Sequence, residues 1–223
     1  MPAPRTTIPT ETLLLLAWLS PAFPTGGFAY SHGLEWAVEA GDVGDEASLR
    51  GWLGDLLAHG SGRSDAILLR HAHRADAAAL AELCAFGAAI AGTRERRAET
   101  LGQGDAFARA ALVWGSARLA ELVEPIPYPV AVGVLAGDHG VAEEDVTAAY
   151  LQAWTANLIS AAVRLVPLGQ TAGLRVLAAL TPTILAVALE TRGVALEDIG
   201  NACFRADIAA MRHETQHTRL FRT

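Results

Sequence analysis

The chain has 223 residues, of which 52% are hydrophobic and 18% charged, and its formal net charge is −7. This composition predicts a globular chain with a substantial core rather than a disordered one. The negative charge argues against a nucleic-acid partner, which needs a basic stripe to neutralise phosphates. All 17 basic residues are arginine, so a lysine-dependent phosphate loop and Schiff-base catalysis are excluded.

Neither of the two most apolar runs predicts a membrane segment. Residues 13–19 resemble a short signal-peptide core, but an acidic residue precedes them and no small-residue cleavage site follows. Residues 176–189 fall short of the ~20 residues that span a bilayer, and a proline interrupts them. Cys84 and Cys203 form no CxxC pair, which favours reduced thiols. We therefore expect a cytoplasmic protein.

The apolar spacing is helical almost throughout the chain. One predicted helix follows Asp45, a plausible N-cap, and ends at Gly60. Its apolar residues recur at i, i+3, i+4, i+7 and i+8, and so occupy one face: Leu49, Trp52, Leu53, Leu56 and Leu57. This pattern predicts an amphipathic helix packed on a core.

A second strong helix follows Gly140, with an acidic first turn at residues 143–145 that suits the helix dipole. Its apolar stripe runs to Pro167 and consists of Leu151, Trp154, Leu158, Ala162 and Leu165. Residues 130–134 could be a strand, but they have no alternating partner and we interpret them as helix. A third helix is predicted from Glu197 towards the C-terminus. The prediction is an all-α single domain over residues 1–223, with a bend at the proline-rich run 124–129.

Residues 20–35 (SPAFPTGGFAYSHGLE) form an unusual connection between apolar segments. Pro24 fixes one backbone angle, and the glycine pair at 26–27 permits angles that other residues avoid, so a defined turn is expected. The three aromatic side chains, Phe23, Phe28 and Tyr30, would not suit a solvated linker. The loop is therefore either packed on its own domain or offered to a partner.

Three segments in this order resemble the UreF family of urease accessory proteins: residues 20–35, residues 166–173 (VPLGQTAG) and residues 206–223 (ADIAAMRHETQHTRLFRT). The resemblance covers nearly the whole chain, from Leu13 to the last residue. It implies an all-helical protein that dimerises and is not an enzyme. It also implies two partners, a second accessory protein, UreD (UreH in some systems), and the GTPase UreG, in a chaperone complex that installs nickel in apo-urease. On this interpretation the chain binds no cofactor stably, because the complex handles nickel and UreG binds GTP.

The resemblance assigns partner contacts by motif position. The C-terminal residues so assigned are His213, Glu214, Arg219, Leu220, Phe221 and Arg222. Those of the opening loop are Phe28, Tyr30, His32 and Glu35. An arginine-rich apolar terminus has the residue types of interface hot spots, so residues 206–223 are expected to be a docking segment that becomes ordered on a partner. A frayed, inert terminus is the alternative.

Residues 213–217 (HETQH) also match HExxH, in which two histidines share a helix face and a glutamate acts as general base. A zinc peptidase using His213, Glu214 and His217 is therefore an alternative. However, no third ligand is indicated, and the histidines extend one predicted helical stripe: Ile199, Cys203, Ala206, Ala210, His213 and His217. We interpret them as packing residues. UreF-like tails usually carry an aromatic at position 217 and often end in serine where this chain has Thr223, so the fine contacts remain open.

Two other polar features receive structural interpretations. Residues 94–99 (RERRAE) are expected to form a solvated helix face with internal ion pairs. His32 could contact nickel transiently, but structural hydrogen bonding is the favoured interpretation. No nucleophile–base pair emerges, so the sequence predicts a non-catalytic protein. A helical adaptor unrelated to urease is the third alternative.

Overall fold

The computed structural model describes residues 8–223, so residues 1–7 of the expected domain lie outside the described part of the chain. The described residues form helices and connections without a strand, which confirms the all-α prediction. The elements are α1 (Thr10–Trp18), η1 (Gly27–Ala29), α2 (Leu34–Glu39), α3 (Glu46–His59), α4 (Ser61–Arg74), α5 (Ala77–Ala89), α6 (Arg94–Ala111), η2 (Leu112–Trp114), α7 (Ala117–Glu121), α8 (Tyr128–Asp138), α9 (Glu143–Leu165), α10 (Gly169–Glu190), η3 (Leu196–Asp198) and α11 (Phe204–His213). Here η denotes a short 3₁₀ helix.

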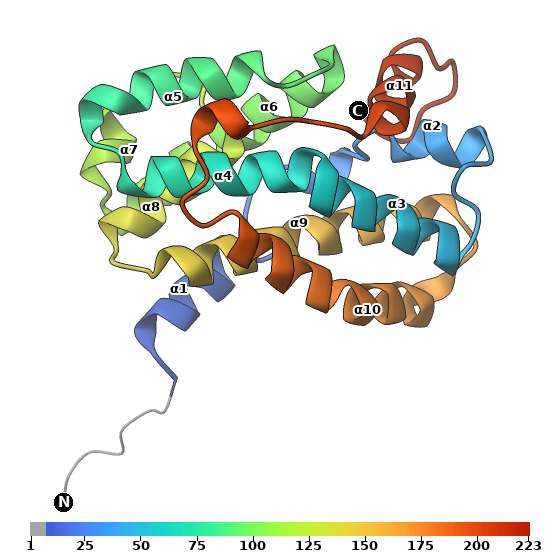
Figure 1. The fold of residues 1–223 in the computed structure, drawn as a ribbon, viewed down its shortest axis with the longest axis horizontal. Helices are drawn as coiled ribbons and strands as arrows, with labels where there is room; N and C mark the ends of the chain where they lie inside the picture. Colours follow the sequence, from blue (N-terminus) through green and yellow to red (C-terminus); the bar gives the residue numbers. More distant parts are fainter. Residues whose placement is uncertain (1–7) are drawn as a thin grey trace, which may run out of the picture.

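The centre of the fold is the pair α4 and α8, which pack against each other more extensively than any other two elements (Figure 1). Glycines make this close approach possible. A Cβ atom built on Gly133 would lie 2.3 Å from the Leu69 carbonyl oxygen, and one on Gly137 would lie 2.4 Å from that of His73. Residues 130–136 of α8 are all buried, so the run that could have been a strand is a core helix, as predicted.

Helices α3 and α9 confirm the two periodic patterns. Asp45 caps α3, because its side chain accepts a hydrogen bond from the Ser48 amide while the Ser48 hydroxyl accepts one from the Asp45 amide. The helix ends at Gly60, and all five predicted apolar residues of its face are buried. Helix α9 begins with the acidic turn and ends before Pro167. These two helices are among the elements that enclose the α4–α8 pair.

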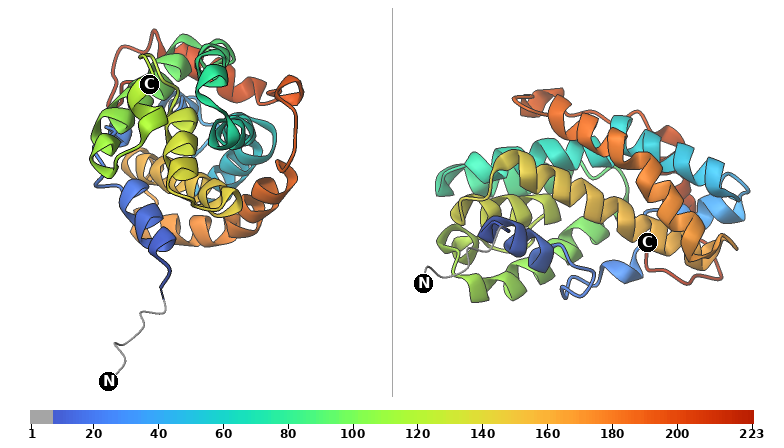
Figure 2. Two further views of the ribbon diagram at one scale, coloured as in Figure 1. Left: turned by 90° about the vertical axis from the view of Figure 1, so that its left-hand side faces the viewer. Right: turned by 90° about the horizontal axis from the view of Figure 1, so that it is seen from below.

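Helix α10 is, among the described residues, the one helix long and apolar enough to pass a length and composition test for crossing a membrane. One face of it is nonetheless buried against α3 and α9, through Val176, Leu180, Ile184 and Val187. Figure 2 shows α10, in orange, on the outside of the bundle. The other face of α10 is exposed and carries Leu174, Leu185 and Leu189, so α10 is a peripheral helix with one face in the core.

The C-terminal helix differs from the prediction. Residues 196–198 form only a short 3₁₀ turn, and α11 begins at Phe204 instead of near Glu197. Between them the chain runs past α4 (Figure 1), and the Ala202 amide donates to the carbonyl of His59, the last residue of α3. The helix then ends at His213, so the continuous helical stripe expected from Ile199 to His217 does not exist.

Candidate functional site

The last ten residues, which we call the C-terminal tail (214–223), lie on the opening loop of the same chain. The Arg222 amide donates to the Ala29 carbonyl at 2.8 Å. Both the amide and the hydroxyl of Ser31 donate to the Thr223 carbonyl, at 2.7 and 2.6 Å. We call the surface formed by residues 28–35 and the start of α6 the tail seat. The expected docking segment is thus already ordered on its own chain.

The backbone at the start of α2 explains why α11 and the loop can meet. His32 and Gly33 both have positive φ, 60° and 75°, which turns the chain sharply before the helix. A Cβ atom at Gly33 would lie 2.7 Å from the Ala210 amide nitrogen of α11. Only glycine tolerates both this angle and this contact. The notable glycine of the loop is therefore Gly33, in addition to the predicted pair at 26–27.

Glu35 is the central acceptor of the tail seat. Its buried carboxylate accepts hydrogen bonds from two tail amides, those of Leu220 at 2.7 Å and Phe221 at 3.0 Å. The Nε2 atom of His213 lies 3.0 Å from the same carboxylate. One carboxylate thus gathers the end of α11 and the tail onto α2.

Glu95 holds the tail from the opposite side. Its carboxylate lies 2.7 Å from Nδ1 of His213 and accepts a 3.2 Å hydrogen bond from Arg219. Burial raises the pKa of Glu95, while His213 and Arg219 oppose this rise. The His213 side chain is fully buried between the carboxylates of Glu35 and Glu95.

A second buried carboxylate on α6, Glu99, connects the tail to His32. The Thr223 hydroxyl donates to Glu99 at 3.3 Å, and Nδ1 of His32 lies 3.4 Å from it. Arg96 forms a 2.8 Å ion pair with Glu99. Burial raises the pKa of Glu99, but Arg96 and His32 outweigh it and bring that pKa to about 2. Burial and the charge of Arg96 lower the pKa of His32 despite the opposing effect of Glu99.

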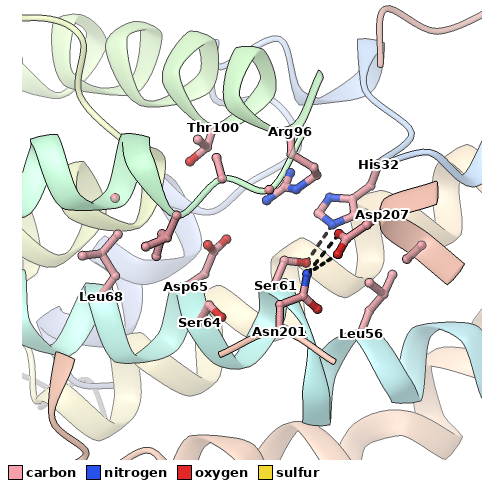
Figure 3. Close-up of a pocket in the computed structure, with 15 residues that line it drawn as sticks. His32, Leu56, Ser61, Ser64, Asp65, Leu68, Arg96, Thr100, Asn201 and Asp207 are labelled. Atoms are coloured by element: carbon pink, nitrogen blue, oxygen red, sulfur yellow. Dashed lines mark hydrogen bonds between the residues drawn. The ribbon is translucent and has the colours of Figure 1, made fainter. Parts of the chain in front are cut away.

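A small cavity of about 50 Å³ lies behind this network. Figure 3 draws the residues that line it. The His32 ring points toward Ser61, with Nε2 2.7 Å from the hydroxyl oxygen. Asp65 faces the cavity from α4, and the Tyr150 hydroxyl donates to its carboxylate at 2.9 Å. Burial raises the pKa of Asp65 to about 6, against the lowering effects of Arg96 and of the Tyr150 hydrogen bond. His32 therefore has structural partners, as the favoured interpretation expected.

The prediction that residues 94–99 form a solvated helix face is wrong. Glu95, Arg96 and Glu99 are buried, not solvated, although the Arg96–Glu99 ion pair exists. Their other partners come from the tail and the opening loop, 67 to 124 positions away in sequence. Spacing along the helix is the same for a solvated and a buried face, so the sequence pattern alone gave no sign of this site.

The structure divides the ten predicted partner-contact residues by exposure. The side chains in solvent belong to Phe28, Arg219, Leu220 and Arg222, and Glu214 is half-buried. Five are buried within this chain: Tyr30, His32, Glu35, His213 and Phe221. Of these, Glu35 binds the tail directly, through the amides of Leu220 and Phe221. Arg164 of α9 connects the tail to the seat. Its guanidinium group stacks over the Phe221 ring of the tail at 4.3 Å and donates a 2.8 Å hydrogen bond to the Phe28 carbonyl of the seat.

The HExxH alternative fails on geometry. The motif requires both histidines on one helix face, but α11 ends at His213, and His217 is exposed in the tail beyond it. Both ring nitrogens of His213 already face carboxylates. The two histidines therefore do not form the paired ligands of a zinc peptidase.

An exposed apolar stripe on α11 was not predicted as a site. Phe204, Ile208 and Met211 recur at i, i+4 and i+7 and are 69%, 55% and 51% exposed. A groove of about 340 Å³, lined by residues that include Trp52 of α3, lies beside Phe204. The helix buries its opposite face against α2 and α6, so this stripe, which we call the α11 stripe, is free for a contact.

Comparison with known proteins assigns the family. The UreF family model matches residues 43–181. The chain is 54% identical to the urease accessory protein UreF of Bradyrhizobium sp. (strain BTAi1) over 217 residues, which cover 94% of this chain and 90% of the relative. It is 54% identical to UreF of Xanthobacter autotrophicus over 224 residues, covering 96% and 92%. It is 51% identical to UreF of Azorhizobium caulinodans over 228 residues, covering 98% of both. The chain therefore belongs to the UreF family of urease accessory proteins and is not an enzyme.

Proposed function

We propose that this protein is a cytoplasmic scaffold that joins UreD (or UreH) to the GTPase UreG during GTP-dependent insertion of nickel into urease. Membership of the UreF family supports the role of an accessory protein in urease maturation. The chain lacks lysine, so the phosphate-loop chemistry of GTP hydrolysis belongs to the partner. Nickel and GTP enter as cargo and substrate of the complex, and this chain holds the proteins that handle them.

The observation that carries the proposal is the exposed apolar surface at the C-terminal end of the molecule. Its two elements are the α11 stripe and, in the tail, Leu220, which is 74% exposed. Apolar anchors flanked by arginines are typical of interface hot spots, and here Arg219 and Arg222 flank Leu220. We assign this surface to UreD.

The buried residues of the tail and its seat contribute to the partner interface indirectly. Glu35 and Phe221 fix the backbone on which Leu220 is displayed, so a change in either would disturb the surface without removing a contact atom. Phe28, which is 72% exposed, lies at the same seat and extends the contact surface to the opening loop. We therefore propose that the exposed residues among the predicted contacts touch the partner, and that the buried ones hold the exposed ones in position.

The test is co-purification of the tagged protein with UreD and UreG. Leu220→Asp places a charge at the centre of the proposed surface and should reduce UreD recovery more than tenfold, because burying an unpaired carboxylate is costly. Val123→Asp is the matched control, since Val123, in the connection between α7 and α8, is 83% exposed. It should recover both partners like the wild type.

Each outcome separates one part of the proposal. Retention of UreD by Leu220→Asp would move the interface away from the tail while keeping the scaffold role. Failure of the wild type to recover either partner would contradict the bridging role itself. Phe221→Ala is less informative than Leu220→Asp, because Phe221 is buried and its loss would also loosen the tail.

We also propose that the protein is a homodimer, as its family resemblance implies. Sedimentation velocity over a range of concentrations measures this directly. A single species at the mass of one 23.4 kDa chain at all concentrations would contradict it.

A further inference from the structure

The exposed face of α10 carries a largely apolar stripe that extends over most of the helix. We call it the α10 stripe, and its members are Leu174, Ala178, Thr181, Pro182, Leu185 and Leu189. They recur every three or four positions, so they share one helix face over about 22 Å. The three leucines are 67%, 57% and 64% exposed, and the stripe contains no ionisable side chain. A continuous apolar face of this kind marks a contact surface.

The α10 stripe lies apart from the surface that we assign to UreD. Helix α10 packs against α3 and α9 and runs along the lower edge of the molecule in Figure 1. Helix α11 packs against α2 and α6 instead, and it carries the α11 stripe on its own exposed side. A protein bound on α10 would therefore leave the α11 stripe and the tail free.

The residue order of the α10 stripe is symmetric about the midpoint between Thr181 and Pro182. Leu185 and Ala178 lie at equal distances on either side of this midpoint, and so do the two outermost leucines. In a two-fold symmetric dimer each contact between two different residues occurs twice. A two-fold axis through the midpoint would make the helices antiparallel and place Leu185 of each copy against Ala178 of the other. Large side chains then face small ones, which permits close helix packing.

The charges beside the stripe follow the same symmetry. Arg175 and Glu190 lie near opposite ends of α10 on the same flank of the stripe. Antiparallel pairing brings like flanks of two helices together, so Arg175 of each copy would lie near Glu190 of the second copy. Glu46 of α3 holds the Arg175 guanidinium at 2.7 Å, and among the described residues the Nη1 group of Arg175 has no partner. A second copy of this chain therefore matches the stripe in both shape and charge.

We propose that the homodimer forms through the α10 stripe, with the two α10 helices antiparallel about a two-fold axis at the stripe's midpoint. This inference rests on the dimer proposed above and names its interface. Leucine side chains that lie in water in a single copy become buried in the pair, which supplies the main driving force for association. The dimer then presents two α11 stripes and two tails, one from each copy.

The first test reads the orientation of the two helices. Thr181→Cys places a thiol beside the two-fold axis, so a short bis-maleimide reagent should join the two copies. Thr171→Cys is the matched control, an exposed threonine on the same helix face whose two copies would lie about 30 Å apart. The wild type, with Cys84 and Cys203, gives the background. Equal cross-linking at positions 171 and 181 would contradict the antiparallel arrangement.

The second test measures dimer strength by sedimentation velocity. Leu185→Asp should raise the dissociation constant of the dimer at least about 100-fold, because each dimer would bury two unpaired carboxylates. Leu16→Asp is the matched control: Leu16 is 66% exposed on α1, outside the stripe, and the variant should dimerise like the wild type. Both positions are exposed, so the circular dichroism of the variants should equal that of the wild type.

The outcomes separate this interface from the dimer itself. A wild type that is monomeric at every concentration would contradict the dimer and this interface with it. Dimerisation of Leu185→Asp at wild-type strength would keep the dimer and reject the α10 stripe as its interface. Dissociation of Leu16→Asp alone would move the interface to α1. None of these results bears on the bridging of UreD and UreG, which co-purification tests separately.

Discussion

The α4–α8 contact and the tail seat stabilise the molecule by opposite means. The helix pair meets through glycine backbone and apolar side chains, and residues 130–136 of α8 are all buried. The tail seat instead buries carboxylates, arginine and histidine. Glu95 and Glu99 have partners more than 100 positions away, in addition to the Arg96–Glu99 pair within α6. Packing of the first kind tolerates little change in volume, whereas the second kind depends on charge and protonation.

This difference indicates which part of the molecule can open by itself. The core helices share one continuous apolar cluster, so their loss would be cooperative. The tail is attached mainly by hydrogen bonds and one buried aromatic ring, that of Phe221. Segments with few apolar contacts open at lower free energy than the core. Leu220, the tail residue that we assign to a partner contact, thus lies on the more easily opened region.

The largest expected effect is in the core. Gly133→Ala would place a methyl group 2.3 Å from the Leu69 carbonyl oxygen and force the helices apart, so the free energy of unfolding should fall by about 3 kcal/mol. Gly51→Ala is the matched control at an exposed position of α3, where no atom lies within 4 Å of the new methyl group, and it should stabilise by about 0.5–1 kcal/mol. Urea unfolding measures both. Equal effects of the two substitutions would contradict the role of the close helix approach.

The next effect is local to the tail. Glu35→Gln removes the charge that accepts two tail amides and His213, so protection of the Leu220 and Phe221 amides should fall by roughly 10- to 100-fold, or about 1.5–3 kcal/mol. Glu121→Gln, an exposed glutamate of α7, is the control. Hydrogen exchange of the tail and urea unfolding of the whole chain should be measured together. An equal loss in both would show that tail and core form one cooperative unit.

A pH experiment tests Asp65, which faces the cavity behind the tail seat. Because the folded state raises the pKa of Asp65 to about 6, it binds that proton more tightly than the unfolded chain does, whose aspartate pKa is about 3.9. This group's contribution to stability therefore falls as the pH rises from about 4 to about 6, and it is constant above. Asp65→Asn should lack this decline and gain about 2 kcal/mol over the wild type across that window. Parallel urea-derived stability curves of the two proteins would reject the prediction.

The smallest expected effect tests the contact of Arg164 with the tail and the seat. Arg164→Ala removes the guanidinium group over Phe221 and its hydrogen bond to the Phe28 carbonyl, and tail protection should fall by about 1 kcal/mol, or roughly fivefold. Arg164→Lys should recover only part of this loss, because an ammonium group lacks the planar stacking surface. Full recovery by lysine would mean that charge alone matters at this position.

Much of the helical scaffold was predictable from the sequence because its signals are local. Asp45 and Gly60 bound α3 as capping chemistry predicts, and the acidic first turn and Pro167 do the same for α9. The C-terminal helix was misjudged because apolar spacing was followed through Gly200 and Asn201. Both are poor helix formers, and the Asn201 side chain instead binds Asp207 and the Cys203 amide.

The candidate site was predictable only in part. The loop and the tail were recognised as unusual by their residue types, and the structure brings them together. Glu95 and Glu99 were missed because their burial depends on segments more than 60 positions away, which leave no mark on the local pattern. The orientation of the tail was missed for the same reason, so Phe221 was expected to face a partner and instead faces its own chain.

The separation between Ser31 and Thr223 has a consequence for biosynthesis. The two residues that meet at the seat are 192 positions apart. At about 5–20 residues per second, a ribosome needs roughly 10–40 seconds to synthesise the intervening chain. During that interval Glu35 and Glu95 have no tail to bind, although the helices that carry them can already fold. Each newly made molecule therefore passes through a stage with an open seat, and any protein that competes with the tail would find its best opportunity on the nascent chain.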